Sequence, residues 1–203
     1  DQPSLAGAIL KVQLTEAGRR AVTDGMDLLG GKGIMRGPRN LLGVAYRHAP
    51  IAITVEGANL LTRALIVFGQ GAIRCHPYVL KEMNATRHAD EAQALLDFDA
   101  ALAGHVGFMI SNKARALVMG LTGSHFVKVP DGVAPATRRY YQQLTRFAAA
   151  LAFLADVSMG TLGGALKRKE KLSARLGDIL SCLYLASATL KRYEADGRPA
   201  ADA

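Results

Sequence analysis

A glutamate followed by a glycine, Glu56-Gly57, could carry proton chemistry, although such a pair alone is not a specific motif. A carboxylate can act as a general base when it lies within hydrogen-bond reach of a substrate proton. A neighbouring glycine lets another molecule approach the backbone closely. Glu56 also stands at the start of an apolar run, where a carboxylate stabilises a helix N-terminus by about 0.3–1 kcal/mol. The residues alone therefore leave two interpretations open, a catalytic base and a helix-terminal charge.

Glycines gather in a second place, Gly30-Gly31-Lys32-Gly33, after a run of helical periodicity. Glycine commonly ends a helix because it adopts the left-handed conformation without strain. Composition alone thus indicates a helix C-cap and a turn here. The chain contains neither a complete GxGxxG pattern nor a nucleotide P-loop.

Metal chemistry has little support in the sequence. The histidines show no metal-ligand spacing: His48, His76, His88, His105 and His125. His76 precedes Pro77 and is expected near the N-terminus of a helix, so we predict no metal site. Cys75 and Cys182 form no CxxC pair, which favours a reduced, intracellular protein.

Composition indicates a globular chain. Its 203 residues suit one large domain or two small ones, and 50% of them are hydrophobic. The formal charge is +8, but the basic residues are scattered and lack an aromatic platform, which argues against nucleic-acid binding. Substrates that carry phosphates, such as CoA, an anionic partner or a membrane surface would suit this charge equally well.

Apolar spacing predicts an all-α fold, because no strand alternation persists. The expected helices cover residues 4–29, 55–57 to 69–71, 77–86, 90–123, 136–162 and 166–195. Residues 34–53 are expected to be irregular because they contain Gly37-Pro38 and Ala49-Pro50. The apolar stretch 147–166 is interrupted by Asp156, so we predict a buried helix or helix hairpin there, not a membrane span. A polar stretch over residues 84–91 predicts two domains, 1–88 and 89–203.

A longer pattern combines these pieces. It runs from Thr23-Asp24-Gly25-Met26-Asp27 and the glycine cluster, through Ile53-Thr54-Val55-Glu56-Gly57-Ala58-Asn59, to Phe68-Gly69-Gln70-Gly71-Ala72-Ile73-Arg74-Cys75-His76-Pro77. This pattern resembles the C-terminal domain of acyl-CoA dehydrogenases, in the long bacterial form used in fatty-acid β-oxidation. The resemblance is close over about residues 1–85, and the remainder resembles the helical extension of those long forms. It implies a helical bundle followed by a helical extension.

The resemblance also implies an activity, the FAD-dependent oxidation of fatty acyl-CoA to trans-2-enoyl-CoA. It assigns Glu56 as the base that removes the α-proton while FAD accepts the β-hydride. It places the backbone N–H of Glu56, together with Gly57, against the thioester substrate. Gly30 and Gly31 would contact the FAD of a neighbouring subunit, and the adenosine part of the cofactor would lie against Ala58, Asn59 and Leu60.

Two positions depart from the family pattern. Asp27 stands where the family often has glutamine, and a carboxylate is a poor partner for a pyrophosphate. Ala58, Asn59 and Leu60 occupy places where threonine and glutamine are common, so backbone contacts are expected to replace most side-chain contacts.

The resemblance further implies a homo-oligomer and an electron-transfer flavoprotein as the electron acceptor. We expect a cytoplasmic protein. Peripheral association with the inner membrane, through the basic run Lys167-Arg168-Lys169-Glu170-Lys171, is the alternative. The family's N-terminal and middle domains supply much of the flavin and CoA site, so these residues alone are expected to be inactive. The rival interpretation is a non-catalytic helical interaction or membrane-docking module derived from the same scaffold.

Overall fold

The computed structural model describes residues 4–198, and every regular element in that range is helical, which confirms the all-α prediction. The four long helices are α1 (Ser4–Leu29), α7 (Glu91–Leu121), α8 (Arg138–Leu162) and α9 (Glu170–Ala195). The shorter ones are α2 (Gly31–Ile34), α3 (Leu42–Thr54), α6 (Val79–Ala85) and the 3₁₀ helix η2 (Gly163–Arg168). A central rod consists of α4 (Asn59–Leu61), the π-helix η1 (Thr62–Gln70) and α5 (Gly71–Cys75).

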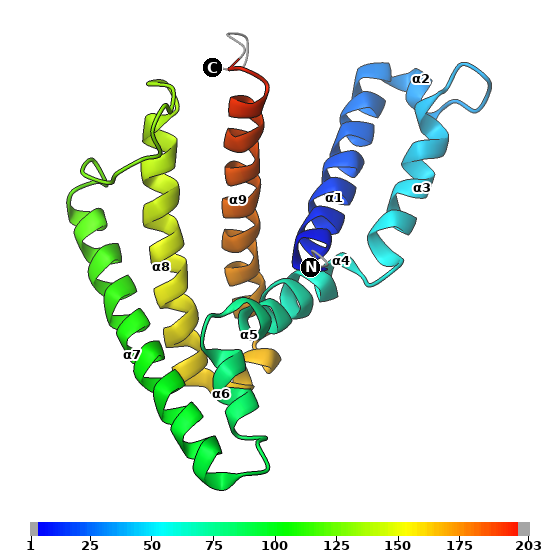
Figure 1. Ribbon diagram of the computed structural model, residues 1–203. Helices are drawn as coiled ribbons and strands as arrows, with labels where there is room; N and C mark the ends of the chain where they lie inside the picture. The colour runs from blue at the N-terminus through cyan, green and yellow to red at the C-terminus, as the bar shows by residue number, and fades with distance from the viewer. Residues whose placement is uncertain (1–3, 199–203) are drawn as a thin grey trace.

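The segment before Glu56 is helical, so the prediction of irregular chain over residues 34–53 is wrong for most of it. Helix α3 contains Pro50, which lacks the N–H that a helix interior normally uses. The side chain of Asn40 accepts a hydrogen bond from the N–H of Gly43 at 2.7 Å and so supports the first turn. Helix α3 then packs along α1 (Figure 1), and tertiary packing of this kind supplies stability that the local sequence lacks.

The rod begins at Asn59, after the predicted start at residues 55–57, and continues to Cys75, beyond the predicted end at residues 69–71. Its middle part packs closely against α9. Gly177 makes this approach possible, because a Cβ atom at that position would lie 2.7 Å from the carbonyl oxygen of Arg63. The guanidinium of Arg63 pairs with the carboxylate of Asp178 across the same contact.

A small apolar core lies where the rod meets the C-terminal helices. Phe68 of η1 is 3% exposed and packs with Leu151, Leu166 and Leu176. These residues come from η1, α8, η2 and α9, so the core joins the rod to the C-terminal helices. Burial of such side chains is the main force that holds the elements together.

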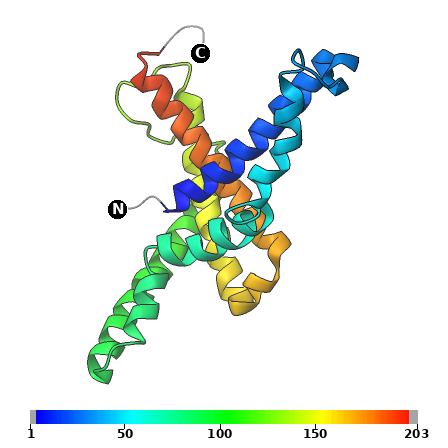
Figure 2. The same ribbon diagram turned by 90° about the vertical axis from the view of Figure 1, so that its right-hand side faces the viewer.

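Helices α7 and α8 pack against each other, and α6 packs against the first part of α7 (Figures 1 and 2). The stretch 147–166, predicted as a buried helix or a helix hairpin, instead forms the second half of α8 and the first part of η2. By length and composition, two stretches among residues 4–198 could cross a membrane: 91–121 and 138–168. Helix α3 with the rod would make a third if the bent pair counted as one span. The predicted boundary between residues 88 and 89 falls in the turn between α6 and α7 and stays a prediction.

Candidate active site

Glu56 lies in the short turn that joins α3 to the rod. Its backbone has a φ of 54°, and Gly57 follows with a φ of 91°. A positive φ is uncommon for a residue that carries a Cβ atom and costs on the order of 1–3 kcal/mol. The surrounding contacts must therefore hold this turn in place.

Lys11 of α1 supplies those contacts. Its ammonium group donates hydrogen bonds to the carbonyl oxygen of Gly57 and to Oδ1 of Asn59, both at 2.7 Å. A third, longer contact of 3.3 Å reaches the carbonyl oxygen of Ile53 near the end of α3. One partly buried lysine thus binds both sides of the Glu56 turn to α1.

Asn59 completes this arrangement and is 6% exposed. Its amide nitrogen donates to Oγ1 of Thr15 at 2.9 Å and to Oε1 of Glu16 at 3.1 Å. Both side-chain atoms of Asn59 are therefore used within the chain. The resemblance implies a cofactor contact at this residue, and a backbone contact would have to provide it.

The backbone N–H of Glu56 remains free. No residue between 4 and 198 accepts a hydrogen bond from it. The carboxylate of Glu56 belongs to an exposed residue, and its neighbours include exposed apolar side chains: Ile51, Val55, Leu60 and Leu61. The turn therefore presents an exposed carboxylate and one free N–H donor, and exposed apolar residues flank it in sequence.

The glycine cluster lies at the other end of the α1–α3 hairpin (Figure 1). Gly30 has a φ of 55°, as a C-capping glycine should, and opens α2 together with Gly31. Both glycines are exposed, and a Cβ atom at either would meet nothing within 4 Å. The helix between Lys11 and Gly30 spans roughly 28 Å at about 1.5 Å per residue. The cluster and Glu56 therefore form two separate surfaces.

Sequence reasoning missed Lys11 and its role. Lys11 and Thr15 are spaced as i and i+4, which places them on one face of α1. That spacing was visible in the sequence. The turn that they hold, however, lies more than forty positions further along the chain. The sequence separation is 44 between Thr15 and Asn59, and 46 between Lys11 and Gly57.

The structure also collects titratable residues at the other end of the rod, which we call the histidine cluster: His76, Glu82, His105 and Asp156. Nδ1 of His76 accepts hydrogen bonds from the N–H groups of Tyr78 and Val79 at 3.2 and 3.1 Å, as expected near a helix N-terminus. Burial lowers the pKa of His76, and the opposing charge of Asp156 only partly offsets this effect. The cluster brings together residues whose sequence spacing shows no metal pattern.

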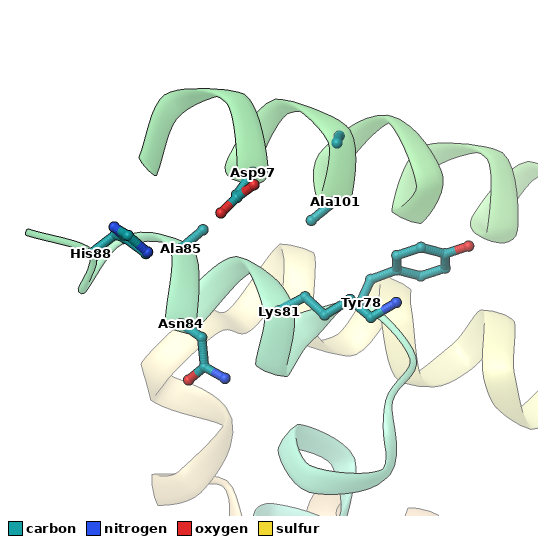
Figure 3. A pocket seen from close by; sticks show the side chains of 8 residues that line it. Tyr78, Lys81, Asn84, Ala85, His88, Asp97 and Ala101 are labelled. Atoms are coloured by element: carbon teal, nitrogen blue, oxygen red, sulfur yellow. The ribbon is translucent and has the colours of Figure 1, made fainter. Parts of the chain in front are cut away.

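A cavity of about 470 Å³ lies beside this cluster, between α6 and α7 (Figure 3). Lys81, Asn84 and Ala85 line it from α6, and Asp97 and Ala101 line it from α7. Tyr78 stands at one end and His88 at the other. The Tyr78 ring stacks on His105 with a centroid separation of 6.0 Å, so it lies between the cavity and the histidine cluster.

Two family comparisons cover almost the whole chain. Residues 1–69 match the family described as acyl-CoA dehydrogenase, C-terminal domain. Residues 73–203 match the family described as acyl-CoA dehydrogenase, C-terminal, bacterial type. No solved structure matches the chain. The resemblance found in the sequence is therefore confirmed, and the chain belongs to the acyl-CoA dehydrogenase family, an oxidoreductase family that generally depends on FAD.

Proposed function

We propose that this chain is the part of an acyl-CoA dehydrogenase that carries the catalytic base, and that Glu56 takes the α-proton of a fatty acyl-CoA. The observation that supports this most is the turn itself. Glu56 is held at a positive φ by contacts from α1, and strained backbone of this kind concentrates at functional sites. A surface carboxylate with only a structural role would gain nothing from that strain.

The free N–H of Glu56 fits a second role in the same step. Loss of the α-proton moves negative charge onto the thioester oxygen of the substrate. A preorganised N–H donor directed at that oxygen stabilises the charge as it develops, and removing one such donor typically costs about 10²–10³ in rate. The Lys11 contacts would hold the donor and the carboxylate in a fixed relation.

A base for such a weak acid needs surroundings from which water is excluded. Ile51, Val55, Leu60 and Leu61 precede and follow the turn in sequence and are exposed. In the proposed enzyme the acyl chain and the family's other domains would cover these apolar side chains.

The residues of this chain could contact FAD mainly through backbone groups and less through side chains. Gly30 and Gly31 offer exposed backbone without a Cβ atom, and Ala58 and Leu60 are exposed as well. FAD, when bound, would supply the acceptor for the β-hydride. Because Gly30 lies roughly 28 Å along α1 from Lys11, the glycines and Glu56 suit the FAD of two different subunits, which supports a homo-oligomer.

The test uses the full gene product that contains this chain, loaded with FAD, and compares it with Glu56→Gln. A long-chain acyl-CoA is added without oxygen, and bleaching of the oxidised flavin is followed by stopped-flow absorbance. We expect Glu56→Gln to slow bleaching by about 10²–10⁴-fold, the usual contribution of a general base. Glu91→Gln, at an exposed glutamate in the first turn of α7, is the matched control and should bleach at the wild-type rate.

Bound FAD, measured by absorbance before mixing, separates loss of the base from loss of the cofactor. Equal bleaching rates in wild type and Glu56→Gln, both with FAD bound, would move the base to another residue. Absence of bleaching in every FAD-bound protein would instead favour the second function considered next.

A second function is supported by α7, which presents many exposed apolar side chains. They include Leu95, Leu96, Leu102, Ile110, Leu117, Val118 and Leu121. Such a surface suits a docking module for a membrane or a partner protein. A docking module would not need the strained Glu56 turn, so we rank this function below the dehydrogenase.

A further inference from the structure

The histidine cluster joins three segments that are far apart in sequence. His76 stands between the rod and α6, His105 lies in α7, and Asp156 lies in α8. One ligand-capable atom from each of these residues lies within 4.8 Å of the other two. From this geometry we infer that the cluster is a site for a divalent transition-metal ion, with Zn²⁺ as the best fit. The inference does not depend on the proposed dehydrogenase activity.

The orientation of His105 carries the first part of the argument. Its Nδ1 lies 2.7 Å from Oε1 of Glu82, and a carboxylate accepts hydrogen bonds, so the ring proton belongs on Nδ1. The other ring nitrogen, Nε2, then directs a lone pair toward Oδ1 of Asp156 at 3.4 Å. A lone pair facing a carboxylate oxygen is repulsive unless a proton or a metal ion lies between the two atoms.

Two further atoms decide between a proton and a metal ion. Nε2 of His76 and Oδ2 of Asp156 have no hydrogen-bond partner within residues 4–198. The two side chains are only 7% and 1% exposed, so water cannot easily satisfy them. Nε2 of His76 lies 2.9 Å from Oδ1 of Asp156, but this contact is not aligned as a hydrogen bond. In the metal-free chain the ring proton of His76 lies on Nε2, because Nδ1 accepts two backbone N–H groups, and this N–H has no aligned acceptor. A proton on His105 would leave this N–H and Oδ2 of Asp156 without partners. A metal ion bound by His76 and by both oxygens of Asp156 would give each of them a partner.

The distances suit a small ion. Metal–nitrogen and metal–oxygen bonds of about 2.0–2.1 Å in a tetrahedral site separate the ligand atoms by roughly 3.3 Å. The distance from His105 to Asp156 is 3.4 Å, close to that value, and the distance from His76 to Asp156 is 2.9 Å, so the latter pair would move apart slightly. Glu82 takes the place of the carboxylate that commonly orients a metal-binding histidine.

The chemistry of the ligands favours zinc. Two imidazoles with a carboxylate suit Zn²⁺, which adapts to irregular sites because its filled d shell imposes no geometry. Glu82 and Asp156 together match the charge of a divalent ion. When Nε2 of His76 binds the ion, the ring proton moves to Nδ1 and the two capping contacts to Tyr78 and Val79 are lost. The site would then fix α6, α7 and α8 to one another.

The test uses the 203-residue chain with both cysteines replaced by serine, because Cys75 and Cys182 are exposed and would bind zinc themselves. The protein is treated with a chelator, dialysed, and titrated with Zn²⁺ alone by isothermal titration calorimetry. Metal content is then measured by mass spectrometry. The variants are His105→Gln and Asp156→Asn, which keep side-chain size. His88→Gln, at an exposed histidine in the neighbouring cavity, is the control.

We expect one saturable Zn²⁺ per chain in the serine background and in His88→Gln. Affinity should fall at least 100-fold in His105→Gln and in Asp156→Asn, and about 10–100-fold in Glu82→Gln, which orients a ligand without being one. Failure of the chain to bind one Zn²⁺, or unchanged affinity in both ligand variants, would overturn the inference.

X-ray absorption on the zinc-loaded serine background gives a second measurement that needs no ligand variant. Two imidazoles in the first shell are expected. A first shell of water oxygens alone would contradict the site even if a ligand variant failed to fold.

Discussion

The role of Lys11 gives the sharpest prediction, because its contacts can be removed without changing the size of the side chain. Lys11→Met keeps the apolar stem and removes the ammonium group. Gly57 would keep only the 3.3 Å contact from the hydroxyl of Thr62. Oδ1 of Asn59 would lose its partner in a residue that is 6% exposed. The Glu56 turn would then lose its main attachment to α1.

The size of the effect follows from two hydrogen bonds of 2.7 Å that involve a charged donor. Each such bond contributes about 1.5–3 kcal/mol when buried, and partial exposure of Lys11 reduces that value. We therefore expect the free energy of unfolding to fall by about 3 kcal/mol. With a urea m-value of about 2–3 kcal/mol/M, the unfolding midpoint should fall by roughly 1 M.

Urea unfolding of the chain, followed by far-UV circular dichroism, measures this shift. Lys113→Met is the matched control, because Lys113 is an exposed lysine within α7, and its midpoint should change little. A double-mutant cycle with Asn59→Ala should give a coupling of about 1 kcal/mol or more, since the two side chains are in direct contact. Equal midpoints for Lys11→Met and Lys113→Met, or additive effects within about 0.5 kcal/mol, would refute the role given to Lys11.

Two further predictions concern the other end of the rod and its contact with α9. Gly177→Ala should destabilise the chain by about 1–3 kcal/mol in thermal or urea unfolding, because the new Cβ would lie 2.7 Å from a backbone oxygen. Gly160→Ala, where the added atom meets nothing, should leave stability unchanged or raise it, and equal effects of the two changes would contradict the close packing. In the presence of a chelator, stability should fall as the pH drops below about 6.5, because burial lowers the pKa of His76 and the unfolded chain then binds the extra proton. His76→Asn keeps a capping acceptor without titrating, so unfolding free energies measured at several pH values should fall less steeply in this variant, and identical slopes would rule out His76 as the cause.

Local signals predicted most of the long helices. The bounds of α1 agree with the prediction, and those of α7, α8 and α9 agree within a few residues, because apolar periodicity and glycine or proline breaks are written into each segment. Helix α3 was missed for the opposite reason. Pro50 argues locally against a helix, while the packing of α3 on α1 that outweighs it depends on distant residues.

The candidate site divides in the same way. Glu56, Gly57 and the glycine cluster were found from a resemblance, and their roles in catalysis and cofactor binding remain predictions. Lys11 was not found, and Asn59 was predicted only as a cofactor contact, because the contacts by which both residues hold the turn cross more than forty positions. The histidine cluster was hidden for a related reason. His76 follows the rod and Asp156 lies in α8, so no spacing rule for a single segment could have connected them.

The rod links these two arrangements of polar groups. Asn59 begins it beside the Glu56 turn, and His76 follows its last residue, Cys75, in the histidine cluster. Contacts with α1 fix the first end, while α7 and α8 fix the second. Between these two ends, α9 packs against the middle of the rod at Gly177. The C-terminal helices therefore contact the element that follows the Glu56 turn. Because the bacterial-type C-terminal region packs on the rod, and the rod begins next to the Glu56 turn, we expect changes at the contact between α9 and the rod to alter the position of Glu56.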